Sequence, residues 1–124
     1  MKKRVLLSIH PEFAEAILDG RKQYEFRRAV FKQDIDEILV YATLPIARVI
    51  GSFKVAAIYE GPPNKIWAET KLLAGVSKAR FDLYFKDRSR AFAIQVSRPK
   101  RFIKPVSLSR FLASNCPPQS FCYV

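Results

Sequence analysis

Lys22, Glu25 and Arg27 place an amine, a carboxylate and a guanidinium within a short stretch near the start of the chain. Together they can clamp a ligand: Arg27 can fork onto a phosphate or a base edge, and Glu25 can accept a hydrogen bond from an exocyclic amine. Lys22 can supply a point charge or, where desolvated, a base with a lowered pKa. The alternative is structural, because Glu25 and Arg27 can also form a plain ion pair on a solvated strand, worth about 0–1 kcal/mol.

The segments around these residues predict a strand, a short helix and a second strand. Residues 4–9 are an apolar strand candidate, and Pro11 suits the first turn of a helix because its missing N–H would be unpaired there. Gly20 is expected to end this helix in a left-handed conformation. In residues 23–27 polar and aromatic side chains alternate, which predicts a half-buried strand with a polar, charged outer face.

The rest of the chain predicts a small α+β fold of about six mixed strands with two or three short flanking helices. Because closure removes exposed edges, the sheet is expected to be closed or nearly closed. A hairpin is expected around the basic run 98–104, and the Pro-rich tail from residue 114 is expected to be irregular. The further strands are expected at 37–43, 48–59 (with Gly51 at a bulge or close approach), 91–96 and 101–103, and helices at 64–73 and 77–85 (with Ser77 as N-cap).

Size and charge point to one small basic domain, residues 1–124. The chain has 22 Lys and Arg against 11 Asp and Glu, and residues 61–124 hold twelve of the basic residues but three acidic ones. Such an excess attracts polyanions, although a solvated basic surface without a partner gives the same composition. No apolar run reaches the ~20 residues of a membrane span, and the apolar stretch after the basic start is too short for a signal peptide. A cytoplasmic protein is expected.

The cysteine and histidine content argues against a bound metal. Cys116 and Cys122 are separated by five residues, which matches no CxxC pattern, and His10 is the single histidine. We expect no metal and no cofactor. The redox state of the cysteine pair is left open, with two thiols favoured in a cytoplasmic setting.

Several of these residues resemble the signature of the ASCH domain family, which is Ser-Ile-x-Pro, a short helix, and Gly-x-Lys-x-x-Glu-x-Arg. The matching segments are 8–11 (Ser-Ile-His-Pro) and 20–27, and the similarity runs over nearly the whole chain. The resemblance implies a PUA-like β-barrel with short helices beside a cleft. It also implies binding of RNA or modified nucleosides, and some members resemble hydrolases that deacylate acylated cytidine or cut RNA.

One position departs from the deacylating relatives, whose nucleophile is a Thr three residues after the Lys. Here that position is Glu25, which has no hydroxyl to acylate. Thr43 can project into the same cleft, but no spacing places it beside Lys22. A metal-independent ribonuclease with Lys22 and Glu25 as acid and base stays open, since positioned proton transfer contributes about 10²–10⁴-fold.

Two basic segments, 78–90 and 98–104, are expected to hold a nucleic-acid backbone. Tyr84 lies among basic residues, which suits single-stranded RNA, but it also belongs to a buried stripe with Phe81 and Phe85. His10 is interpreted as a helix-entry residue. The predicted ligand-binding residues are Lys22, Glu25, Arg27, Arg28, Thr43, Lys78, Arg80, Tyr84, Arg98, Lys100 and Arg101.

Three functions are therefore carried forward. The first is a binding domain for nucleic acid, RNA above all, or for a nucleotide-like ligand, with a role in transcription or translation. The second is a small metal-independent hydrolase acting on RNA or on a modified nucleoside. The third is a regulator whose basic surface meets a protein. The sequence fixes neither the base preference nor the oligomeric state, and no membrane partner is expected.

Overall fold

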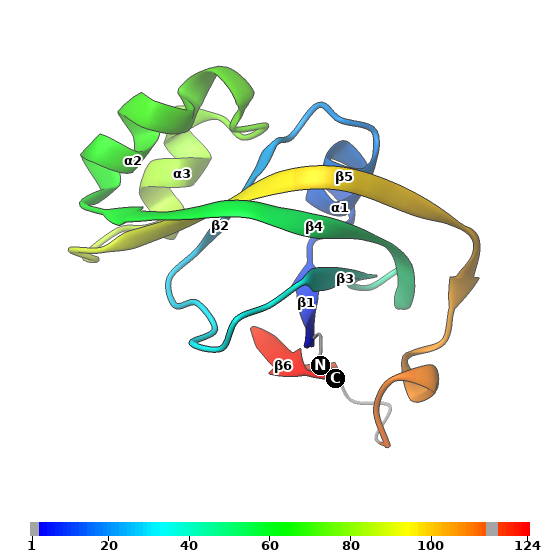
Figure 1. The fold of residues 1–124 in the computed structure, drawn as a ribbon. Coiled ribbons are helices and arrows are strands. Elements are labelled where there is room, and N and C mark those ends of the chain that lie inside the picture. The colour runs from blue at the N-terminus through cyan, green and yellow to red at the C-terminus, as the bar shows by residue number, and fades with distance from the viewer. Residues whose placement is uncertain (1–2, 114–116) are drawn as a thin grey trace.

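One mixed sheet of six strands runs through the computed structural model, which describes residues 3–113 and 117–124. The strand order is β2-β5-β4-β3-β1-β6, with β1 and β3 parallel and the other neighbours antiparallel. The sheet curls into a half-barrel, as Figure 1 shows, which confirms the predicted fold class. The strands are β1 (Arg4–Ile9), β2 (Tyr24–Arg27), β3 (Glu37–Ala42), β4 (Arg48–Gly61), β5 (Ala91–Val106) and β6 (Phe121–Tyr123).

Three short α-helices flank the sheet: α1 (Pro11–Leu18), α2 (Pro63–Thr70) and α3 (Lys78–Tyr84). Helices α2 and α3 lie together at one end of the sheet, while α1 lies behind β5 in Figure 1. Helices α1 and α3 begin where the sequence predicts, and α2 begins one residue earlier, at Pro63. Pro11 occupies the first turn of α1, and the Ser77 hydroxyl accepts a hydrogen bond from the backbone N–H of Arg80 at 3.2 Å. Gly20 follows α1 with a φ of +90°.

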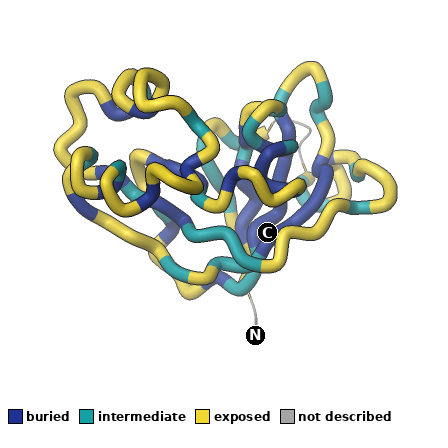
Figure 2. The backbone as a smooth tube through the Cα atoms, turned by 90° about the horizontal axis from the view of Figure 1, so that it is seen from above, coloured by how far each residue is buried: buried dark blue, intermediate teal, exposed yellow. Residues whose placement is uncertain are grey.

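The core is organised around β1, whose apolar residues are buried on both faces of the sheet. Val5, Leu7 and Ile9 pack on one side with α1, and Leu6 packs on the other. A separate cluster under α2 and α3 packs against β2 and β5. Figure 2 shows buried residues along the central strands and exposed ones along the loops. Burial of one such large apolar side chain is worth about 1.5–3 kcal/mol.

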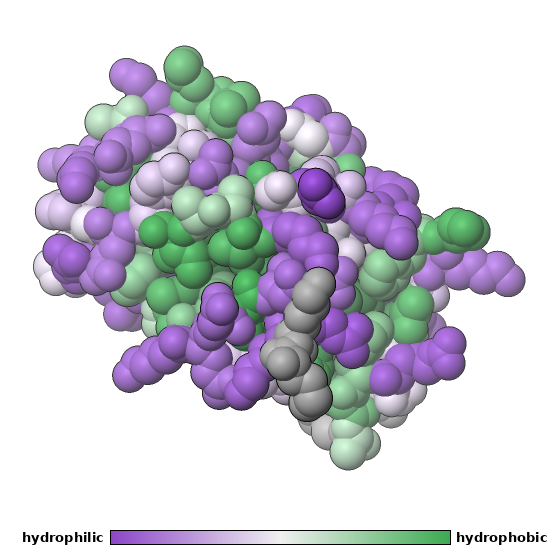
Figure 3. Space-filling view, in the orientation of Figure 1, coloured by the Kyte–Doolittle hydropathy of each residue, from purple (hydrophilic) through white to green (hydrophobic). Residues whose placement is uncertain are grey.

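Hydrophilic side chains cover most of the face seen in Figure 3 and surround a central hydrophobic patch. Within the described residues, no helix is long and apolar enough to cross a membrane. Cys116 lies outside the described residues, so the redox state of the cysteine pair stays a prediction.

Two predictions about strands are wrong. The basic run 98–104 forms no hairpin, because β5 continues through it and pairs with β4 along most of its length. Register shifts between the two strands and a left-handed φ of +49° at Arg98 let the chain bend without turning back. The close approach at Gly51 is confirmed, since a Cβ there would lie 2.4 Å from the Lys100 carbonyl oxygen.

The C-terminal segment is also more regular than its prolines suggest. Residues 121–123 form β6, which pairs antiparallel with β1 and places Cys122 opposite Leu6. The backbone N–H of Val124 then donates to the Arg4 carbonyl at 3.0 Å. The apolar character of this short segment outweighs the preceding Pro-Pro pair, because β1 offers an unpaired edge beside it.

Candidate functional site

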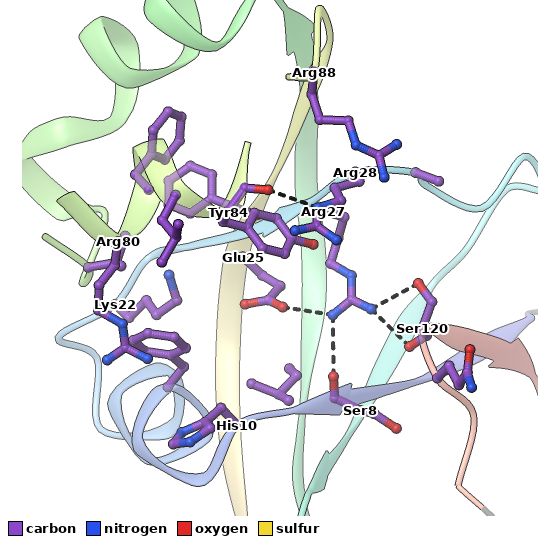
Figure 4. A pocket seen from close by; sticks show the side chains of 18 residues that line it. Ser8, His10, Lys22, Glu25, Arg27, Arg28, Arg80, Tyr84, Arg88 and Ser120 are labelled. Carbon is purple, nitrogen blue, oxygen red and sulfur yellow. Dashed lines mark hydrogen bonds and ion pairs between the residues drawn. The ribbon is translucent and has the colours of Figure 1, made fainter. Parts of the chain in front are cut away.

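A pocket of about 810 Å³ opens between β1, the start of α1, β2, α3 and the segment before β6. This volume lies within the ~300–1,000 Å³ of typical ligand sites. Figure 4 shows the polar side chains converging on it from these separate elements. Five cationic side chains and one carboxylate line it: Lys22, Arg27, Arg28, Arg80, Arg88 and Glu25.

Lys22 lies in the wall of this pocket as a buried amine, only 2% exposed. Its Nζ donates to the Ala74 carbonyl at 2.7 Å and sits 4.7 Å from the ring centre of Phe26 and 5.2 Å from that of Phe13. Burial among these groups lowers the Lys22 pKa from 10.5 to about 8, and the nearby carboxylate of Glu25 only partly opposes the shift. An amine of this kind can act as a proton donor or acceptor near neutral pH.

The connection between α2 and α3 holds Lys22 in place. The Leu73 carbonyl accepts from the backbone N–H of Gln23 at 2.9 Å, one residue before the Ala74 carbonyl that binds the lysine amine. Gly75 follows with a φ of +68°, and a Cβ on it would lie 2.4–2.8 Å from Lys22 atoms. Only glycine therefore lets this loop rest directly on the lysine.

Glu25 and Arg27 form a buried ion pair in the pocket wall. The Arg27 Nη1 donates to the Glu25 Oε2 at 3.0 Å, and the two side chains are 9% and 7% exposed. The prediction that these residues form a solvated outer face of β2 is therefore wrong. The alternation of the sequence correctly predicted that the two side chains share a face of β2. It did not predict that segments distant in the sequence cover this face.

The covering segment is the C-terminal one, for which no functional role was predicted. The Ser120 carbonyl and hydroxyl accept from the Arg27 Nη2 at 3.0 and 2.9 Å, and the Ser8 carbonyl accepts from Nη1 at 3.3 Å. The Ser8 hydroxyl in turn donates to the Pro118 carbonyl at 2.6 Å. Arg27 thus ties β2 to β1 and to the segment before β6 through both Nη groups, while its buried Nε has no hydrogen-bond partner among the described residues. Its role as a ligand contact stays a prediction.

At the pocket mouth, α3 and the end of β2 bring an aromatic ring and a guanidinium together. The Arg28 Nε donates to the Tyr84 carbonyl at 2.8 Å, and its guanidinium carbon lies 4.3 Å from the centre of the Tyr84 ring. Burial raises the Tyr84 pKa, so its phenol stays protonated at neutral pH and able to donate. Across the mouth, Arg80 stacks on Phe13 at 4.6 Å and pairs with Glu12 at 2.5 Å.

Residues 7–100 match the ASCH domain family, which is most of the chain. This chain belongs to the ASCH family. It is 33% identical over 126 residues to the ASCH domain-containing ribonuclease of Zymomonas mobilis, covering 99% of this chain and 85% of that protein. The crystal structure of ASCH from Zymomonas mobilis has a TM-score of 0.90 at 32% identity, over 98% of this chain and 87% of that one. A single-residue mutant of the Zymomonas mobilis protein gives a TM-score of 0.91 at 31% identity, over 99% of this chain and 91% of its own.

The resemblance noted in the sequence is thereby confirmed, and its most specific block, residues 20–27, supplies the pocket wall of this ASCH domain. The family match ends at residue 100, whereas Ser120 also lines the pocket. The segment that closes the pocket nevertheless has a counterpart in the Zymomonas mobilis structures, because those alignments cover 98–99% of this chain.

The structure brings together some of the predicted site residues and separates others. Lys22, Glu25, Arg27, Arg28, Arg80 and Tyr84 all line the pocket. Thr43 does not, because it sits past the end of β3, where its backbone N–H donates to the Ile9 carbonyl at 3.1 Å. The expectation that it projects into the cleft is therefore wrong. Four predicted contacts lie on the surface away from the pocket lining, and as nucleic-acid contacts they stay predictions: Lys78, Arg98, Lys100 and Arg101.

Five polar or charged residues of the pocket lining were not predicted as ligand contacts: Ser8, His10, Arg88, Gln119 and Ser120. Ser8 and His10 flank the start of α1, and the Ser-Ile-x-Pro pattern was a usable signal for both. Ser120 had no local signal beyond its Pro-Pro-Gln-Ser setting, because its partner Arg27 is 93 residues away. Arg88 lies in the basic segment 78–90, but nothing in the sequence set it apart from its neighbours.

Proposed function

We propose that this ASCH domain binds RNA and holds one nucleotide in the pocket. The observation that carries the proposal is the convergence of Lys22, Glu25 and three rim arginines, Arg28, Arg80 and Arg88, on one cavity of suitable size. Proteins bind single-stranded RNA mainly through cationic side chains, which contact the backbone, and aromatic rings, on which bases stack. The ribonuclease name of the Zymomonas mobilis relative supports RNA as the polyanion.

Cleavage of the bound RNA is the second candidate function. It is favoured by the Lys22 amine, whose pKa of about 8 keeps it mostly protonated, yet readily deprotonated, near neutral pH. In such a step an RNA 2′-hydroxyl would lose its proton to Glu25 and attack the adjacent phosphorus. The bond from phosphorus to the 5′ oxygen would break, and Lys22 would protonate that oxygen.

Deacylation of an acylated nucleoside has less support. The hydroxyls of Ser8 and Ser120 line the pocket, but each is engaged, one with the Pro118 carbonyl and the other with Arg27. Tyr84 is the remaining hydroxyl among the lining residues, and its raised pKa makes it a poor nucleophile. The Thr of the deacylating relatives is replaced by Glu25.

The test uses labelled single-stranded RNA with the wild type, Lys22→Met and the exposed control Lys86→Met. Each protein is assayed for RNA retention and for cleavage over a salt series. Retention should weaken with salt, by about 0.7 in log affinity per log unit of salt for each phosphate neutralised. Affinity that does not change with salt would contradict RNA binding through this pocket.

Cleavage is judged in the same samples. Products that form with the wild type and Lys86→Met but not with Lys22→Met would establish the ribonuclease. Retention without products in any of the three would leave a binding domain. Equal cleavage by wild type and Lys22→Met would remove the lysine from the reaction.

A further inference from the structure

Most of the free hydrogen-bond donors of the pocket mouth lie on one side, at Arg28 and Arg88. In residues 3–113 and 117–124, Arg88 has no side-chain hydrogen bond or ion pair, and Arg28 uses only its Nε, on the Tyr84 carbonyl. Both Nη groups of Arg28 therefore keep their donors for a ligand. Figure 4 shows Arg28 and Arg88 on the same side of the pocket, with Arg80 on the opposite side.

The other cations of the pocket already have a partner, although the buried Nε of Arg27 and the Nε and Nη2 of Arg80 have no hydrogen bond among the described residues. Arg80 is paired with Glu12, Arg27 is bound to Glu25 and the C-terminal segment, and Lys22 gives one N–H to the Ala74 carbonyl. A phosphate at the mouth would therefore find its strongest unoccupied donors on Arg28 and Arg88. A planar guanidinium whose ring stacking fixes its orientation suits such an oxyanion.

The inner wall of the pocket favours a nucleobase over a phosphate. Only Oε2 of Glu25 is bonded to Arg27, and Oε1 has no hydrogen-bond partner among the described residues. A phosphate placed there would meet a carboxylate, whereas an N–H group of a nucleobase would satisfy it. The rings of Phe13, Phe26 and Phe81 also line the pocket and offer apolar surface to a base.

We infer that the pocket binds a nucleotide in one orientation, with its phosphate on Arg28 and Arg88 and its base toward Glu25. This inference rests on the proposed RNA binding and adds the direction in which the nucleotide enters. It makes Glu25 a contact of the base, so it is an alternative to the cleavage step in which Glu25 takes the proton of a 2′-hydroxyl. It also makes free nucleoside monophosphates ligands of the pocket. The phosphate of an internal RNA nucleotide and that of a monophosphate present the same chemistry to the two arginines.

The experiment measures binding of nucleosides and of their 5′- and 3′-monophosphates by calorimetry. The proteins are the wild type, Arg28→Met, Arg88→Met and the control Lys65→Met, which removes an exposed cation outside the pocket lining and outside the basic segments 78–90 and 98–104. The wild type should bind one monophosphate isomer at least about tenfold more tightly than the nucleoside. Each arginine variant should lose about five- to tenfold of that advantage, since each removes charge-assisted hydrogen bonds. Lys65→Met should keep it.

Two outcomes would overturn the inference. One is equal binding of nucleoside and both monophosphates by the wild type, and the other is a loss in Lys65→Met as large as in the arginine variants. The RNA retention assay separates this failure from failure of the proposed function. Wild type that retains RNA but shows either outcome binds RNA in another orientation, whereas wild type that retains no RNA refutes both proposals.

Discussion

Replacing the buried Lys22 by methionine should change how stability depends on pH. In the folded protein burial lowers the Lys22 pKa to about 8, against 10.5 for the ordinary side chain. Between these values the unfolded chain holds a proton that the folded chain has released, so raising the pH favours the folded state. Each pH unit in this window is worth about 1.4 kcal/mol, which gives about 3 kcal/mol from pH 7 to pH 10.5. Lys22→Met should lack this gain.

Urea unfolding of the wild type and Lys22→Met at intervals from pH 6 to pH 10.5 measures the effect as the difference between their free energies of unfolding. Other groups titrate alike in both proteins, so the difference isolates Lys22. The free energy of unfolding of the wild type should rise relative to that of the variant only above about pH 8. Below that pH the difference between the two free energies should be constant. The exposed control Lys86→Met should show no such trend. A constant difference across the whole range would refute the argument that burial depresses the lysine pKa.

Three further substitutions test the contacts that hold the pocket, each by urea unfolding. Gly75→Ala should cost about 1–3 kcal/mol more than Gly20→Ala, because both positions have positive φ but only the first is overpacked, and equal costs would contradict the close contact. Arg27→Met should lower the free energy of unfolding by about 3–5 kcal/mol, because it leaves Glu25 buried and unpaired. The double variant with Glu25→Met should recover most of that stability, and no recovery would contradict the buried ion pair. Ser120→Ala should lower the free energy of unfolding by about 1 kcal/mol, since the backbone carbonyl still accepts from Arg27. A loss above about 3 kcal/mol would show that the hydroxyl stabilises the fold by more than this one hydrogen bond.

Local sequence patterns predicted most of the fold because the residues that start and end each element act within that element. The proline at the start of α1, the glycine after it and the Ser77 cap each act within a few residues of the helix end they define. The alternation in residues 23–27 likewise identified β2 and placed Glu25 and Arg27 on one face. What it missed was burial of that face.

Burial of the Glu25–Arg27 face depends on contacts far apart in the sequence. The groups that cover Arg27 come from Ser8, 19 residues earlier, and from Ser120, 93 residues later. Alternation cannot distinguish a charged face turned to water from one closed by a distant strand, since both have the same period. The burial of Lys22 could not be predicted for the same reason, because Ala74 and Gly75, which contact it, are more than 50 residues away in the sequence.

Counting charges along the sequence did not show which cations the fold brings together at the pocket. The cationic excess lies in residues 61–124, yet the pocket takes Lys22, Arg27 and Arg28 from the first half and Arg80 and Arg88 from the second. Four of the twelve cations of the second half are matched by carboxylates, through the ion pairs Lys78–Asp82, Arg80–Glu12, Arg90–Glu60 and Arg101–Glu15.

Binding strength should therefore follow the unpaired cations at the pocket rather than the net charge of +11. Arg88 and Arg90 allow a direct comparison, because both are exposed and close in sequence, but Arg90 is paired with Glu60 at 2.9 Å and lies outside the pocket lining. Arg88→Met should weaken RNA retention more than Arg90→Met, although each removes one positive charge. Equal losses would mean that RNA responds to the overall field of the protein and not to this pocket.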